Sequence, residues 1–169
     1  EQTAPQVADP PVDPRKQQRD ALWEEARRLK GEGQFAEAAT VGERMLAIER
    51  DWLGEAHREI ITSIEWLQGV YQSAEDLASY KRKLEEALQW RVAQQGAEHW
   101  ETTLARLRQH GIEPLSLEQF KKLSEADRLD SEHLRLFGAS EYAEAIPIAQ
   151  RVCDVRREIL GEEHPDYAM

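Results

Sequence analysis

Three of the five histidines recur at one kind of position in the chain. His57, His99 and His164 each stand three residues after a glycine. Histidine is a common zinc ligand, but a metal site needs its ligands to converge on one point. Residues at equivalent places in successive stacked units lie far apart along the stack, so this spacing indicates turn residues. We therefore expect no metal site.

The sequence offers no convincing nucleophile either. A nucleophile elbow needs a second glycine two residues after its serine, and Tyr142 stands at that place after Ser140. We expect Ser140 to cap the N-terminus of the helix that follows it. Cys153 lies on an apolar helical face with Ala149 and Val152, where a free cysteine is usually a small buried hydrophobic residue. Because a glycine-rich phosphate loop is also missing, the sequence predicts no enzyme, no cofactor and no catalytic residue.

Charge and composition narrow the classes of partner. The 169 residues include 22 basic and 33 acidic side chains, which gives a net charge of -11. A surface of this sign repels nucleic-acid phosphates and anionic lipids, and it favours a neutral or basic partner. No apolar run approaches the roughly 18 residues that a membrane-spanning helix needs, so we expect no membrane insertion.

Apolar residues recur at helical spacing through most of the chain. Asp13 before a proline predicts the start of the first helix, and Ser116 with Gln119 forms a capping-box pattern that opens a later one. Gly42 would allow a neighbouring helix to approach closely. The expected helices run from about 14 to 31, 35 to 53, 56 to 71, 77 to 95, 98 to 111, 116 to 136 and 140 to 160.

The chain also repeats itself. Gly54 and Gly96 are 42 residues apart, and a period of roughly 20 to 50 residues indicates stacked supersecondary units. Phe35 and Tyr142 stand at equivalent places in the first and third copies, and their separation exceeds two such periods by 23 residues. We therefore predict an inserted segment between the second and third copies. The predicted organisation is a disordered tail or linker at 1–13, a first repeat block at 14–107, an insert at 108–130 and the start of a second block at 131–169.

The repeated unit resembles the tetratricopeptide repeat, in the longer form found in kinesin light chains and in bacterial multidomain repeat proteins. The resemblance rests on a G-x-[Phe/Tyr]-x-x-A turn followed by a helix ending in L-G-E-E-H-P, and the copy that begins at Ser140 matches it best. The resemblance implies an all-α fold of about seven helices. The helices would stack as antiparallel pairs in a right-handed superhelix, a solenoid whose inner groove binds peptides or proteins without catalysis. The last residues open a further helix, so we expect the chain to continue beyond Met169 and to leave an open C-terminal edge at which it could self-associate.

The expected function is therefore a protein-interaction scaffold. Trp66, Tyr71 and Arg91 are the first candidates for contact with a partner, because aromatic residues and arginine dominate interface energetics. The alternative is that the chain is a regulatory or sensor arm of a larger enzyme, a protease or kinase whose catalytic domain lies outside these residues. The compartment stays open between the cytoplasm and, if a signal or anchor precedes Glu1, the periplasm.

Overall fold

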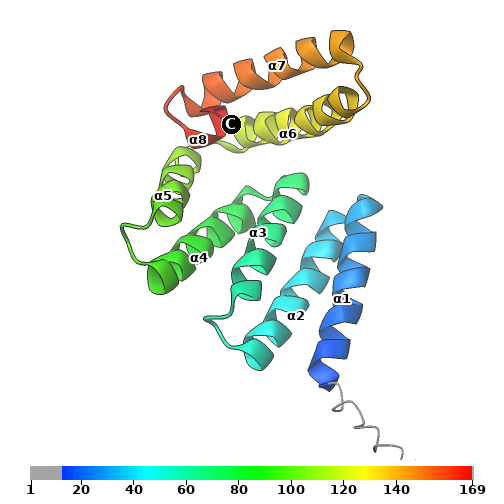
Figure 1. Cartoon of the computed structure of the whole chain (residues 1–169), viewed down its shortest axis with the longest axis vertical. Coiled ribbons are helices and arrows are strands. Elements are labelled where there is room, and N and C mark those ends of the chain that lie inside the picture. Colours follow the sequence, from blue (N-terminus) through cyan, green and yellow to red (C-terminus); the bar gives the residue numbers. More distant parts are fainter. Residues whose placement is uncertain (1–12, 169) are drawn as a thin grey trace, which may run out of the picture.

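The computed structural model describes residues 13–168, and this part of the chain is all-α, with helices joined by short turns (Figure 1). The predicted tail at 1–13 lies outside the described residues except for Asp13. The seven substantial helices of the described range confirm the expected fold class. In order, the elements are α1 (Pro14–Gly31), α2 (Phe35–Leu53), α3 (Arg58–Ser73), α4 (Leu77–Gln95), α5 (Trp100–Ile112), α6 (Leu117–Gly138), α7 (Tyr142–Leu160) and the single turn α8 (Pro165–Ala168).

The helices form sequential antiparallel pairs. α1 packs on α2, α3 on α4, and α6 on α7. Because α2 also packs on α3 and α4 on α5, the first five helices form one continuous stack. Figure 1 shows the α6–α7 pair lying across the end of this stack, with α8 folded back beside α5.

Two of the predicted helix starts are confirmed. The Asp13 carboxylate accepts a hydrogen bond from the Arg15 N–H at 2.9 Å, which satisfies one of the free amides at the start of α1. At the start of α6, the Ser116 hydroxyl accepts from the Gln119 N–H at 3.3 Å, and the Gln119 side chain accepts from the Ser116 N–H at 3.0 Å. This is the expected capping box.

The turn between α6 and α7 has the same conformation as the turn between α1 and α2. Gln34 and Glu141, which directly precede Phe35 and Tyr142, are the N-caps of α2 and α7, with φ, ψ of -85°, 65° and -85°, 57°. Before them, Gly33 and Ser140 both have positive φ, 77° and 64°. The prediction that Ser140 caps α7 is therefore wrong. This turn needs a left-handed residue to close the preceding helix, and the Ser140 N–H donates to the Phe137 carbonyl at 3.0 Å.

The core of the stack depends on a close approach of α2 and α3, as the small residue at position 42 predicts. A Cβ on Gly42 would lie 2.7 Å from Trp66 Cζ3 and 2.9 Å from Leu67 Cδ2. Leu46 and Ile64 are buried in the same apolar cluster. Only glycine leaves room here for the Trp66 ring.

A smaller apolar cluster joins the α6–α7 pair to the stack. Its buried members are Leu84, Ile112, Leu115 and Leu123. Polar contacts support the same junction, because Glu75 in the α3–α4 turn pairs with Lys121 at 3.1 Å and with Arg128 at 3.2 Å. The predicted insert at 108–130 spans the end of α5 and the first half of α6. The boundaries of the two repeat blocks remain a prediction.

Replacement of Gly42 by alanine tests the close approach of α2 and α3. The new Cβ displaces the Trp66 ring, and we expect the free energy of unfolding to fall by about 1–2 kcal/mol despite the better helix propensity of alanine. Gly31→Ala is the matched control, because a Cβ there meets nothing within 4 Å. Urea unfolding should show Gly31→Ala unchanged or slightly more stable; equal effects of the two substitutions would contradict the packing argument.

Candidate protein-interaction surface

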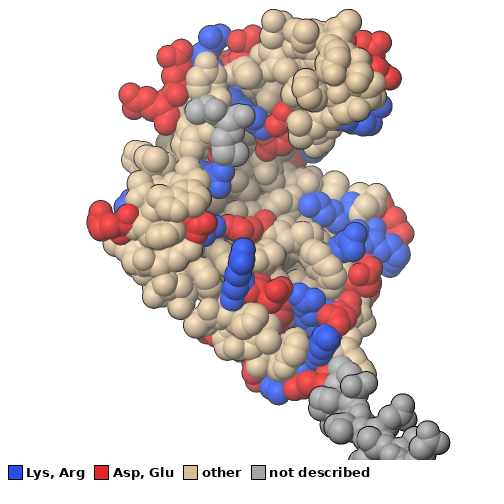
Figure 2. All heavy atoms as spheres, in the orientation of Figure 1, with Lys and Arg blue, Asp and Glu red and all other residues tan. Residues whose placement is uncertain are grey.

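The α6–α7 pair supplies most of the lining of a continuous groove, to which α3, α4, α5 and α8 contribute Gln72, Tyr80, Ile112, Asp166 and Tyr167. Two hollows form it, with volumes of about 560 and 690 Å³. They share three lining residues, His133, Ala149 and Cys153, so they are two parts of one surface. We call this surface the α6–α7 groove. Figure 2 shows the molecule hollowed between the α6–α7 pair and the helices below it.

The part of the groove near the α6–α7 turn is apolar. Phe137 and Ile146 are each 57% exposed and Tyr142 is 49% exposed, which are large values for side chains of this size. The rings of Phe137 and Tyr142 meet edge to face with centroids 5.3 Å apart. Leu134, 62% exposed, extends the apolar surface into the neighbouring hollow. A contiguous exposed apolar surface of this kind typically marks an interaction site.

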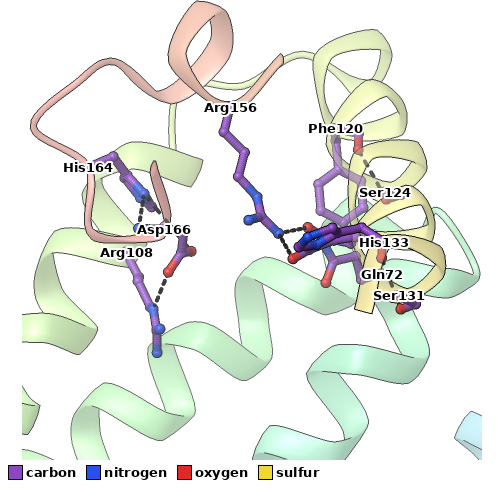
Figure 3. Close-up of polar contacts among 11 residues, drawn as sticks. Gln72, Arg108, Phe120, Ser124, Ser131, His133, Arg156, His164 and Asp166 are labelled. Atoms are coloured by element: carbon purple, nitrogen blue, oxygen red, sulfur yellow. Dashed lines mark hydrogen bonds and ion pairs between the residues drawn. The ribbon is translucent and has the colours of Figure 1, made fainter. Parts of the chain in front are cut away.

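The opposite part of the groove is acidic. Arg156 of α7 reaches across to α6 (Figure 3). Its Nη2 lies 2.7 Å from Asp127 Oδ1 and 2.9 Å from Asp130 Oδ2. Burial disfavours the charge on Arg156, but the hydrogen bonds to these two carboxylates outweigh it and raise the pKa of Arg156. Asp166 from α8 adds a third carboxylate to the lining. Carboxylates thus outnumber the one arginine that lines this part of the groove.

The residues around α8 complete the acidic end. The Asp166 carboxylate pairs with Arg108 of α5 at 2.8 Å (Figure 3). His164 accepts from the Asp166 N–H at 3.2 Å through Nδ1 and is buried against Gly111. A Cβ on Gly111 would lie 2.3 Å from the His164 ring, so glycine is required for this contact. Burial lowers the pKa of His164.

Trp66, the first residue predicted to contact a partner, packs between helices of the stack. Its ring meets Trp23 edge to face with centroids 5.2 Å apart. The Lys30 ammonium lies 5.7 Å from the centroid of the same ring. Trp66 is half-buried, and it holds α3 on the α1–α2 pair.

Tyr71 and Arg91, the other two predicted residues, have polar partners of their own. The Tyr71 hydroxyl donates to Glu43 Oε1 at 2.8 Å, and burial together with this carboxylate raises the pKa of Tyr71 to about 12. Arg91 pairs with Glu65 and, at 3.3 Å, with Glu101. Each of the three predicted residues therefore has a different set of neighbours, and their role in partner binding stays a prediction.

The residues of the α6–α7 groove were not among the sequence-based candidates. The prediction that Cys153 is buried is wrong, because its thiol is exposed in the groove, while Val152 beside it is buried. Periodicity identified the apolar face of α7 correctly but could not show which part of that face the other described helices leave exposed. One feature of the sequence does relate Cys153 to the first repeat. At the offset that separates Phe35 from Tyr142, Cys153 corresponds to Leu46, which is buried in a cluster with residues of α3.

Residues 13–168 contain neither a cluster of metal ligands nor a helix that could span a membrane. Across 13–168, no three His, Cys, Asp or Glu side chains lie close enough together to hold a metal ion. In the same range, no helix has the length and apolar character needed to cross a bilayer.

Comparison with known protein families assigns part of the chain. Residues 134–166 match the family model described as tetratricopeptide repeat. The match covers the end of α6, all of α7 and the turn into α8, and it confirms the resemblance to the kinesin light chain type for this copy. A comparison with curated proteins finds no match to the chain.

The buried His164 predicts a pH dependence of stability. Its folded pKa lies below the ordinary value of 6.5, so the unfolded chain binds the proton more readily. The stability that neutral His164 contributes is therefore complete above pH 6.5 and is lost as the pH falls below that value. The difference in urea midpoint between pH 7.5 and pH 5 should shrink in His164→Asn.

His57→Asn is the matched control for this experiment. His57 caps α3 in the same way, with Nδ1 accepting from the Glu59 N–H at 3.2 Å, but its side chain is exposed. We expect His57→Asn to keep the pH dependence of the parent chain. If His57→Asn and His164→Asn change it equally, burial at position 164 is not its cause.

Proposed function

We propose that this chain, in which residues 134–166 are a tetratricopeptide repeat, is a scaffold that binds a protein or peptide in the α6–α7 groove. Tetratricopeptide repeats are in general protein-interaction units, and this repeat includes the end of α6 and all of α7, the two helices that supply most of the groove lining. The proposal involves no catalysis.

The observation that carries the proposal is the gathering of Leu134, Phe137, Tyr142 and Ile146 on one surface. Each leaves about half or more of its side chain exposed, at a cost in free energy that a docked partner would remove. Aromatic residues are enriched in the binding hot spots of protein interfaces. The Phe137–Tyr142 pair would be the anchor of this interface.

Charge supports a basic or neutral partner. The chain has a net charge of -11, and the three carboxylates at the acidic end of the groove outnumber the two arginines that pair with them, Arg108 and Arg156. Complementary charge raises the rate of encounter and suppresses the wrong partners. Two copies of this chain would repel each other, so a different molecule is favoured over self-association.

Substitution of Ile146 by aspartate tests the proposal. Ile146 is 57% exposed, so the change should alter the free energy of unfolding by less than about 0.5 kcal/mol while it places a charge in the apolar part of the groove. We expect proteins that the immobilised parent chain captures from a lysate of its source organism to be lost with Ile146→Asp. Quantitative mass spectrometry measures the difference.

Leu107→Asp is the matched control, because Leu107 on α5 is 49% exposed and does not line the groove. It should capture the same proteins as the parent chain. Equal capture by both variants would show that the groove is not the docking surface. Sedimentation of the isolated chain over a concentration series separately reports whether it self-associates.

A further inference from the structure

The turn between α3 and α4 carries an acidic residue in a conformation that favours glycine. Glu75 has a φ of 57°, which lies in the left-handed region. The equivalent residue of the α1–α2 turn is Gly33, with a φ of 77°, and that of the α6–α7 turn is Ser140, with a φ of 64°. The three turns share this conformation, but only the α3–α4 turn places a long charged side chain in it.

The conformation of Glu75 belongs to the way in which α3 ends. The Asp76 N–H donates back to the Tyr71 carbonyl at 2.9 Å, and the residues after Gly33 and Ser140 make the same closing bond. A helix end of this type needs a left-handed residue just before the donor, and glycine takes that place without strain. Glu75 takes it at a cost in free energy, because its Cβ disfavours the left-handed region. A favourable contact of its side chain should therefore offset this cost.

That contact is with α6. Glu75 Oε2 lies 3.1 Å from Lys121 Nζ, and Glu75 Oε1 lies 3.2 Å from Arg128 Nη2. In Figure 1 the α3–α4 turn lies at the end of the stack that faces α6. Lys121 and Arg128 are two helical turns apart, which is roughly 10 Å along the axis of α6. One carboxylate thus grips α6 at two points, and two points define the direction of a helix.

The α5–α6 turn is the place about which the α6–α7 pair can pivot. Leu115 in this turn and Ile112 before it are buried with Leu84 of α4 and with Leu123 of α6. This apolar cluster lies at the start of α6, so it fixes where the helix begins and leaves its direction to contacts further along. The pair of Glu75 with Arg128 lies beyond the cluster.

We propose that Glu75 is an electrostatic latch, whose ion pairs with Lys121 and Arg128 set the angle of the α6–α7 pair on the stack, and that this joint loosens when salt screens the pairs. The latch is a property of the joint, so it does not depend on what the α6–α7 groove binds. It makes the relative orientation of two parts of the molecule respond to ionic strength.

The exposure of the latch suits a reversible contact. The side chains of Lys121 and Arg128 are 50% and 57% exposed, and that of Glu75 is 31% exposed. An ion pair this exposed shifts an equilibrium by a factor of roughly 1.5 to 5, and concentrated salt screens it. Two such pairs favour one angle without locking it. Lys121, and after it Arg128, lower the pKa of Glu75, so the carboxylate stays charged near neutral pH.

Distances between the two parts of the molecule test the inference. Nitroxide labels at Ala47→Cys on α2 and Ala143→Cys on α7, both at exposed positions, report the angle in the full chain with Cys153→Ser. Double electron–electron resonance should give a narrow distribution of distances at low salt. The share of molecules outside it should rise severalfold at roughly 1 M sodium chloride. Glu75→Gln keeps the left-handed residue but removes the charge, so it should give the broad distribution at both salt concentrations.

Two variants separate the charge from the backbone. Glu75→Gly removes both the ion pairs and the strain, so it should broaden the distribution as Glu75→Gln does while it unfolds at a higher urea concentration than Glu75→Gln. Ser140→Gly relieves the same kind of strain in the α6–α7 turn without loss of an ion pair. It should raise the urea midpoint of the parent chain and keep its narrow distribution of distances.

Removal of the two cations completes the test. Lys121→Met together with Arg128→Met should broaden the distribution as Glu75→Gln does, and adding Glu75→Gln should broaden it no further, because both changes remove the same ion pairs. Further broadening would mean that the cations act through other partners, and a narrow distribution in Glu75→Gln would mean that the charge does not set the angle. Either result overturns the inference. Broadening in Glu75→Gly alone would assign the effect to the flexibility of glycine and overturn it as well.

Discussion

The structure depends on one constraint: an antiparallel helix pair buries one face internally and leaves a second face that another helix has to cover. On α1–α2 that helix is α3, and the fit is close enough that Gly42 has no room for a Cβ beneath Trp66. α5 packs on α4 in the same manner, although the apolar cluster between them, which includes Leu84 and Ile112, is smaller. On the α6–α7 pair the equivalent helix begins with α8, and side chains of α3, α4 and α5 line the same hollow. Among the described residues, the part of this surface around Phe137, Tyr142 and Ile146 stays exposed.

Charged groups inside the stack hold the helices together as ion pairs. The Lys83 ammonium is buried between α2 and α4, where it lies 2.9 Å from Glu43 Oε2 and 2.8 Å from Glu86 Oε2. Burial lowers the pKa of Lys83, while the hydrogen bond to Glu43 opposes this shift. Buried Glu49 pairs with Arg19 at 2.8 Å in the same way. A partner removed from such a pair would leave a buried charge uncompensated, at a cost of roughly 3–5 kcal/mol, so these side chains act as parts of the framework.

Much of the fold was predictable from local signals. Glycine after α2 and α7, the Asp13 cap and the Ser116 capping box each act within a few residues, so the sequence alone located the helices. The errors were of another kind. Ser140 was assigned as a cap because its type suits one, but the turn geometry required a left-handed residue there. Cys153 was expected to be buried because periodicity shows which face of a helix is apolar but not which neighbour covers it. The groove stayed hidden for the same reason.

The central claim is the proposal that a protein or peptide partner docks on the exposed apolar part of the α6–α7 groove, around Phe137, Tyr142 and Ile146. Cys153 is the single cysteine of the chain, it is exposed, and it lines both parts of the groove, so it reports on occupancy directly. The most direct measurement is the rate at which iodoacetamide alkylates Cys153 with and without a saturating concentration of a protein that the immobilised chain captures. If the captured protein occupies the groove, the rate falls in proportion to the fraction of the chain that is bound. An unchanged rate at saturation would place the captured protein elsewhere and contradict the claim.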